Sequence, residues 1–294
     1  MRAFLRGSML VSLCLVLPLL AQSKVGVELA DVSDNRINHD MMRGSLEMRI
    51  KLTGDDLDRA LASRIVIKEA TDDLGTQLMQ ESRVPDFSPA EYNAMGLQVS
   101  VAQPPRKAKT VKVKGTVELY VPSRDPNAIV TIDKPLAKLD KPLSAPKLKS
   151  AKLTITPMSR DGYAKAQEAR KLTPEKIEQL KIKARAEGAS ESEVELMAGL
   201  AEAFGSIEGP LDEGSVALSG KSIDFERIFR IDFLAADGEA VHMTSRGSST
   251  RDDGVTIMTL QPSDALPPNA PMRITLLTDK ARMSFPFELT VALP

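Results

Sequence analysis

A strict alternation of apolar and polar residues runs through short segments at both ends of this 294-residue chain. In residues 45–53 (SLEMRIKLT) every second side chain is apolar. Residues 111–121 alternate in two sets, and Gly115 between the sets predicts a β-bulge that resets the register. Because successive side chains of a strand point to opposite faces, this period of two predicts half-buried β-strands. An amphipathic helix would instead need apolar residues every three or four positions. Both ends of the chain are therefore expected to be β-structure.

More strands are predicted from β-branched or alternating segments, over residues 64–70, 97–101, 153–155, 228–234, 255–260, 272–277 and 285–292. Turn-forming residues separate them, for example Asp237-Gly238 and Pro267-Pro268. Several short strands between regular turns are typical of a β-sandwich.

The middle of the chain changes to a helical period. Thr173-Pro174 is a helix start, with Thr as N-cap and Pro at the first helical position. Ser190 and Glu193 have the spacing of a capping box, which predicts a second helix directly after it. We expect an α-helical hairpin here, preceded by a shorter helix over residues 161–171.

The two β-regions share an order of features. In each, a strand leads to an Asp/Gly turn, and a later strand runs into a Gln-Pro pair, Gln103-Pro104 in one region and Gln261-Pro262 in the other. We interpret this as a diverged internal duplication. Coincidence is the alternative, because an order of strands and turns is easily matched by chance.

These patterns predict a mainly-β protein with two immunoglobulin-like β-sandwich domains and an α-helical hairpin between them. The expected divisions are a signal peptide over 1–23, an extended lead-in over 24–43, a first sandwich over 44–158, the hairpin and linker over 159–207, and a second sandwich over 208–294.

The N-terminus has the pattern of a secretory signal peptide. Arg2 and Arg6 precede the apolar run Met9 to Leu20, and Ala21-Gln22-Ser23 supplies small residues before a predicted cleavage at Lys24. An uncleaved membrane anchor is the alternative, but the run is shorter than the about 20 residues that a spanning helix needs. We expect a secreted or periplasmic protein without a membrane span after cleavage.

Composition excludes some classes of site. Cys14 is the only cysteine and is lost with the signal peptide, so the mature chain has no disulfide. A remaining chain of about 270 residues can bury a core without one. Aromatic residues make up only 4% of the chain, with no Trp, which counts against a stacking platform for nucleic acid or sugars. The net charge of −1 indicates no partner.

No catalytic, cofactor-binding or metal-binding residue is predicted. The two histidines, His39 and His242, lie in different regions, and no G-x-S-x-G motif is present. Ser248, Ser249 and Asp252 follow His242 closely enough for a hydrolase triad to be drawn on paper, but we interpret His242 as a surface histidine. Two separated histidines without a mature cysteine also argue against zinc.

Aspartates cluster in three predicted loops, at Asp55-Asp56 with Asp58, at Asp72-Asp73, and at Asp252-Asp253. Calcium binds such oxygen ligands, but turns favour Asp for their own hydrogen bonds, which is the interpretation we prefer. Residues 101–152 hold 12 Lys and Arg against 4 Asp and Glu. This basic region could attract an envelope protein or a polyanionic surface; alternatively, its lysines lie on solvated strand faces and edges.

The sequence therefore predicts an exported, non-catalytic protein that serves as an extracytoplasmic binding or structural module of the bacterial envelope. Two alternatives stay open. One is a secreted hydrolase acting on cell-wall or extracellular polymer, and the other is a calcium-stabilised adhesin.

Overall fold

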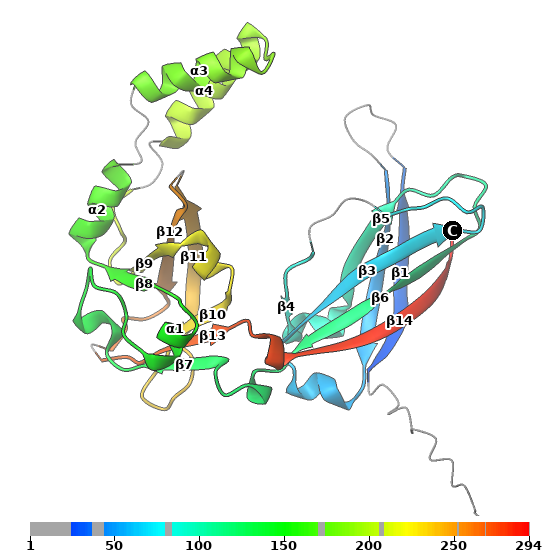
Figure 1. The fold of residues 1–294 in the computed structure, drawn as a ribbon, viewed down its shortest axis with the longest axis horizontal. Helices are drawn as coiled ribbons and strands as arrows, with labels where there is room; N and C mark the ends of the chain where they lie inside the picture. Colours follow the sequence, from blue (N-terminus) through cyan, green and yellow to red (C-terminus); the bar gives the residue numbers. More distant parts are fainter. Residues whose placement is uncertain are drawn as a thin grey trace, which may run out of the picture. The chain divides into compact units, whose positions relative to one another are not determined.

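The computed structural model describes residues 25–36, 44–79, 84–169, 174–205, 209–251, 253–267 and 269–293 (Figure 1). The predicted signal peptide lies outside these residues. The chain is mainly β, with several antiparallel sheets, as the alternation predicted. It divides into two compact units. Unit 1 comprises Met1–Arg59, Ile65–Val117 and Phe285–Pro294, and unit 2 comprises Ala60–Arg64 and Glu118–Ser284.

Two sheets hold most of unit 1. The first has the order β1-β2-β5, formed by β1 (Gly26–Asn35), β2 (Ser45–Thr53) and β5 (Leu97–Ala102). The second has the order β14-β6-β3-β4, formed by β14 (Arg282–Ala292), β6 (Thr110–Tyr120), β3 (Ala62–Asp72) and β4 (Ser88–Pro89). The two strands with the clearest alternation are β2 and β6, and their alternate side chains are buried. Two 3-10 helices, Asp55–Arg59 and Ala90–Met95, connect strands of this unit.

The expected lead-in over residues 24–43 contains a strand. β1 pairs with β2 in an antiparallel register from Gly26↔Thr53 to Asn35↔Ser45. It is an edge strand without a buried side chain, so it has no buried face that an apolar alternation would mark. Its position is set by backbone pairing with β2, which leaves no trace in local composition.

Unit 2 also contains two sheets. The first has the order β10-β13-β7, formed by β10 (Ile228–Phe233), β13 (Met272–Leu276) and β7 (Ile129–Ile132). The second has the order β11-β12-β9-β8, formed by β11 (Met243–Thr250), β12 (Val255–Pro262), β9 (Val216–Lys221) and β8 (Ile155–Met158). Buried side chains of both sheets, such as Phe233 and Leu260, belong to one apolar core.

Short helical elements complete that core. The helix α1 (Pro146–Ser150) contributes Leu148, and α5 (Ser222–Phe225) contributes Phe225. Three 3-10 turns also lie in unit 2, at Pro122–Arg124, Pro135–Ala137 and Asp279–Ala281.

Two strands, β7 and β14, do not pair with the strand that precedes them in the sequence. β7 directly follows β6 in the sequence but pairs antiparallel with β13 of unit 2. Conversely, β14 directly follows β13 but lies beside β6. An ion pair joins Lys112 of β6 to Glu288 of β14 at 2.7 Å. The expected division therefore differs from the structure: residues 118–158 fall in unit 2 and residues 285–294 in unit 1.

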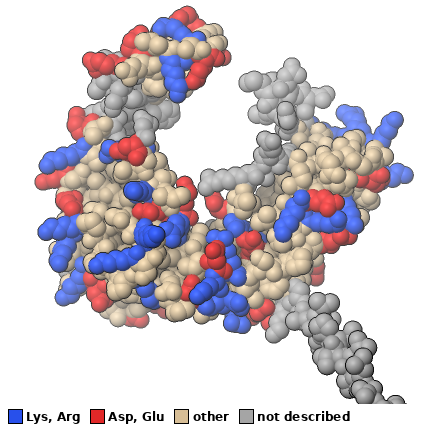
Figure 2. Space-filling view, viewed as in Figure 1, with Lys and Arg blue, Asp and Glu red and all other residues tan. Residues whose placement is uncertain are grey.

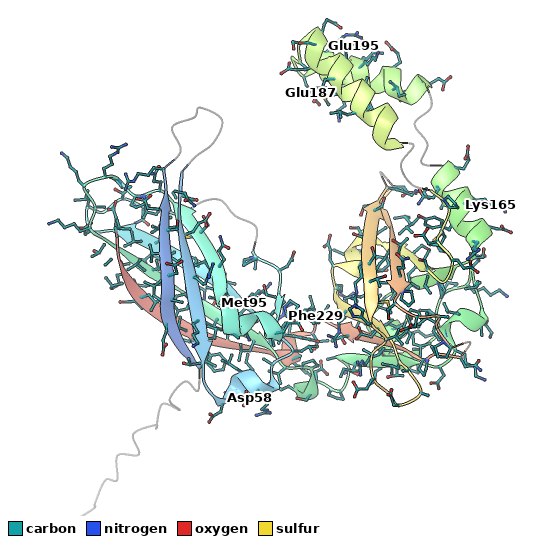
Figure 3. The ribbon with its side chains drawn as sticks, turned by 180° about the vertical axis from the view of Figure 1, so that it is seen from behind. Asp58, Met95, Lys165, Glu187, Glu195 and Phe229 are labelled. Carbon is teal, nitrogen blue, oxygen red and sulfur yellow. The ribbon has the colours of Figure 1, made fainter. Side chains whose placement is uncertain are left out.

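Three longer helices follow β8: α2 (Arg160–Glu168), α3 (Pro174–Ala186) and α4 (Glu191–Gly205). The capping box predicted at the start of α4 is present, because Ser190 N donates to Glu193 Oε2 at 2.7 Å and Glu193 N donates to Ser190 Oγ at 3.4 Å. Lys181 of α3 pairs with Glu195 of α4 at 3.0 Å. Glu187 and Glu195 lie on the exposed surface of these helices (Figure 3).

Candidate ligand-binding pocket

The outer face of the β11-β12-β9-β8 sheet is only partly covered. Tyr163 of α2 packs with Ala217 of β9 and Ile257 of β12 in a small apolar cluster. Leu211, from the segment that leads into β9, packs against the same cluster. This cluster fixes α2 and residues 209–215 above one part of the sheet and leaves the part beside β11 open.

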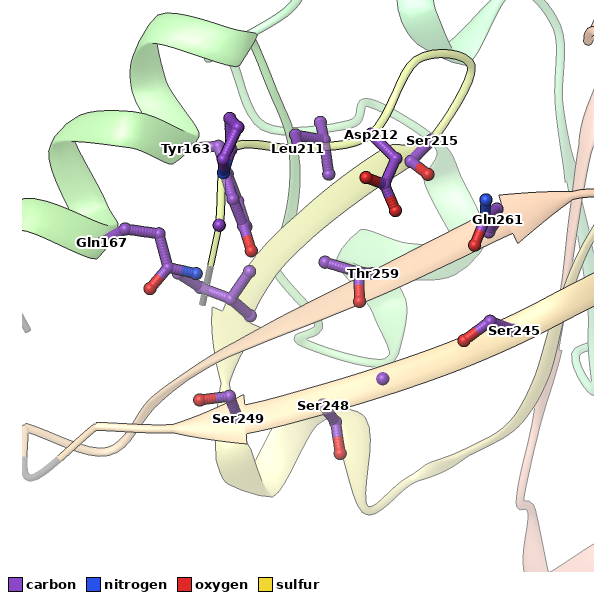
Figure 4. Close-up of a pocket in the computed structure, with 14 residues that line it drawn as sticks. Tyr163, Gln167, Leu211, Asp212, Ser215, Ser245, Ser248, Ser249, Thr259 and Gln261 are labelled. Atoms are coloured by element: carbon purple, nitrogen blue, oxygen red, sulfur yellow. The ribbon is translucent and has the colours of Figure 1, made fainter. Parts of the chain in front are cut away.

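The open part is a pocket of about 450 Å³ (Figure 4). Its floor comes from β11 and β12, and its walls come from α2 and the 209–215 segment. The lining residues are Tyr163, Gln167, Gly209, Pro210, Leu211, Asp212, Ser215, Ser245, Gly247, Ser248, Ser249, Ile257, Thr259 and Gln261. The volume lies within the range of small-ligand sites, about 300–1,000 Å³.

The strand register explains why the floor is recessed. Gly247 of β11 lies directly opposite Thr259 of β12, and Ser245 lies opposite Gln261. A Cβ atom at Gly247 would come within 2.8 Å of Thr259 Oγ1, closer than real Cβ atoms approach. Glycine at this position therefore leaves room for the threonine hydroxyl to face the pocket, where Figure 4 shows it between Tyr163 and the serines of β11.

The lining is rich in unused hydrogen-bonding groups. In the described part of the chain, the side chains of Ser245, Ser249, Thr259 and Gln261 make no hydrogen bond to the protein. Hydroxyls and amides both donate and accept, so these groups can bind a polar ligand of mixed character. Asp212 is the one carboxylate among the lining residues that the structure describes.

The residues weighed as a hydrolase triad are only partly brought together. Ser248 and Ser249 line the pocket, whereas His242 is exposed in the loop before β11 and does not. Its backbone carbonyl accepts a hydrogen bond from Ser263 N at 2.9 Å. His39 and Asp252 lie outside the described residues. Sequence reasoning noticed the serines only as neighbours of His242 and missed the other lining residues.

Two of the aspartates considered for calcium, Asp72 and Asp253, make turn hydrogen bonds. Asp72 Oδ1 accepts from Leu74 N at 2.9 Å and from Thr76 N at 2.7 Å. Asp253 Oδ1 accepts from Val255 N at 3.1 Å, and its carboxylate pairs with Arg251. Among the described residues, no group of three or more His, Cys, Asp or Glu could hold a metal ion. These contacts are those that turns alone would require.

The basic region 101–152 is divided between the two units and is partly neutralised. Lys112 pairs with Glu288, and Lys114 pairs with Glu69 at 2.9 Å across neighbouring strands. The hydrogen bond from Lys112 lowers the pKa of Glu288, and that with Glu69 raises the pKa of Lys114. Figure 2 shows both signs of charge intermixed on the face drawn. The pairs at Lys112 and Lys114 favour solvated strand faces over one continuous basic patch.

Comparison with family models, curated proteins and solved structures finds no match to this chain. Within the described residues, no helix is both long and apolar enough to cross a membrane. The pocket of unit 2 is thus the feature from which a function can be argued.

Proposed function

We propose that this protein is an exported, non-catalytic binding module of the bacterial envelope, and that it holds a polar ligand in the pocket beneath α2. The observation that carries the proposal is the lining of that pocket. It combines a recessed glycine floor with the side chains of Ser245, Ser249, Thr259 and Gln261, which make no hydrogen bond within the described protein. Such groups favour a ligand that replaces their hydrogen bonds to water with bonds of its own.

The chemistry of the lining supports binding rather than turnover. General acid–base catalysis or nucleophilic attack needs a base within hydrogen-bond reach of the reacting group. The described lining offers no histidine and no second carboxylate beside Asp212. We therefore favour a binding role over the hydrolase alternative.

We also propose that each unit is an immunoglobulin-like sandwich, with α3 and α4 as a helical hairpin inserted in unit 2. The strand orders support this. In immunoglobulin lettering, β8-β9-β12-β11 corresponds to A-B-E-D and β10-β13-β7 to C-F-G. In unit 1, β1-β2-β5 corresponds to A-B-E and β14-β6-β3-β4 to G-F-C-C′. The chain then contains two copies of one fold that have exchanged their G strands, as expected of a duplication.

Export rests on the N-terminal pattern of Arg2, Arg6, the apolar run and the small residues before Lys24. Fractionation of cells that express the full chain tests it, together with N-terminal sequencing of the product. We expect a product that begins near Lys24 in the periplasm or the medium. A full-length product in the cytoplasm would remove this part of the proposal.

Two neighbouring substitutions on β11 test the pocket. Both Ser245 and Thr244 are exposed, but only Ser245 lines the pocket. Ser245→Tyr places a large side chain in the pocket, and Thr244→Tyr is the matched control. Purified protein is incubated with an extract of the envelope, and the retained material is analysed by mass spectrometry. We expect a component that wild type and Thr244→Tyr retain and Ser245→Tyr loses; equal retention by all three would contradict a role for the pocket.

A further inference from the structure

Among the strands that the structure describes, β11 is an open edge of its sheet, because it pairs with β12 alone. From Ser245 to Thr250 its register with β12 is regular. Three other edge strands carry features that discourage further pairing, namely Pro157 in β8, Pro286 in β14 and a register shift in β1, whereas the edge strands β5 and β7 carry neither a proline nor a register shift. β11 has no proline and consists mostly of small polar residues, so its outward backbone groups remain accessible to an added strand.

A second hollow lies on the other side of β11, between β11 and β10. It has a volume of about 130 Å³ and includes Arg230, Arg246 and Phe229 in its lining. It shares Gly247 and Ser248 with the larger pocket, so the two hollows flank the same residues of one strand.

The charge of the side chains at and beside this hollow is unbalanced. Asp232, whose side chain is only 4% exposed, accepts from Arg230 Nε at 2.8 Å and from Arg246 at 3.3 Å. Arg273 of β13 lies 3.7 Å from the same carboxylate. Three guanidinium groups thus surround one buried carboxylate, and no other carboxylate in the described residues pairs with them. The side chains of Arg230 and Arg246 remain 37% and 42% exposed, so they can still bind an anion.

We infer that β11 binds an extended acidic peptide as an added strand, an inference that rests on the proposed binding function and names its ligand. Successive side chains of the added strand point to opposite faces. One set enters the polar pocket, and the alternate set faces the hollow, where a carboxylate of the peptide pairs with Arg230 and Arg246. The main chain supplies affinity and the two hollows supply specificity. An acidic glycan would meet the same arginines but would not use the strand edge.

The test begins with a library of capped heptapeptides in which Val alternates with randomised positions, panned on the purified protein. We expect enrichment of Asp or Glu at one alternating position. An enriched peptide is then compared with its Gln counterpart and with an N-methylated version by calorimetry. Loss of the carboxylate weakens binding roughly tenfold, because charge-assisted hydrogen bonds to arginine are lost. N-methylation on the pairing edge abolishes binding, because it removes donors that only an added strand uses.

Protein variants assign the contacts. Arg246→Gln removes the preference for the acidic peptide over the Gln peptide. Arg273→Gln is the matched control, since Arg273 also faces Asp232 but does not line the hollow, and it keeps the preference. Circular dichroism of both variants verifies that they fold.

The outcomes separate the two proposals. Enrichment of neutral peptides that Ser245→Tyr abolishes would overturn the acidic ligand and leave the binding function standing. Absence of any enriched peptide that binds below about 1 mM would overturn the inference. Equal binding of the N-methylated peptide, or Arg246-dependent binding of sulfated oligosaccharides in place of peptides, would overturn the added strand.

Discussion

Deleting residues 285–294, which form most of β14, should unfold unit 1 and leave unit 2 folded. β14 is the next strand after β13 of unit 2 in the sequence, yet it lies beside β6. Phe287 sits over Gly115 of β6 so closely that a Cβ atom on the glycine would come within 2.8 Å of the ring. Unit 2 does not need β14, because β7 already pairs with β13.

The size of the effect follows from the side chains that β14 buries. Val291 is fully buried and is worth about 2 kcal/mol, whereas Phe285, Phe287 and Leu289 are half-buried and are worth about 1 kcal/mol each. The sum of about 5 kcal/mol is comparable with the whole stability of a small domain, about 5–15 kcal/mol. Removing the strand should therefore unfold unit 1 or bring it close to unfolding.

Hydrogen exchange measured by mass spectrometry distinguishes the units. In the deletion variant we expect loss of protection in β2 and β6, with β9, β12 and β13 still protected. A synthetic peptide of residues 285–294 added in excess should restore protection in unit 1. Loss of protection in β13 with β2 intact would refute the exchange of strands.

The remaining predictions concern single groups. Val130→Asp, at a fully buried position of β7, should destabilise unit 2 alone, while Ile129→Asp, at an exposed position, should not; equal effects in urea unfolding would contradict the pairing of β7 with β13. Burial raises the pKa of Tyr120 to about 12, and the charge of Asp125 adds to this. The stability that the neutral phenol contributes is therefore complete below about pH 10 and is lost as the pH rises through 12. Tyr120→Phe should flatten this alkaline decline in thermal melts. Burial acts to raise the pKa of Asp72, but hydrogen bonds from Thr76 and Leu74 outweigh it and lower that pKa. Wild type should therefore lose stability as the pH falls below about 4, and Asp72→Ala should lose less stability over the same range. EDTA should leave the melting temperature unchanged, and a clear decrease would revive the calcium-stabilised alternative.

Local sequence patterns predicted most strands and helix starts because those elements carry their own periodicity. β2 and β6 each bury every second side chain, and the capping box of Ser190 and Glu193 depends on residues three apart. β1 was not predicted, because an edge strand without a buried side chain shows no apolar alternation in the sequence. β7 was not predicted as a strand, because its four residues are too few to show a period. β14 was predicted as a strand, but its unit was not, because its apolar alternation fits either neighbour.

The pocket was hidden for a related reason. Its lining comes from α2, the 209–215 segment, β11 and β12. Of these, β11 and β12 are neighbours in the sequence, whereas α2 and the 209–215 segment reach the pocket by packing on the sheet. In sequence, the run Met243 to Thr250 is simply polar and rich in serine. This run lines a pocket only because the strand register places Gly247 opposite Thr259 and because α2 covers one side of the same sheet face. A cluster of arginines around Asp232 likewise requires three separate strands.

The positions of β7 and β14 imply that unit 2 can fold before unit 1 is complete. Apart from residues 60–64, unit 2 is built from one continuous segment, residues 118–284, so its sheets can form as soon as that segment is available. Unit 1 cannot complete its second sheet until β14 is available, because β6 would otherwise be left as an open edge. The pocket and the arginine hollow both lie in the continuous unit. The candidate ligand site therefore lies in the unit that is complete without β14.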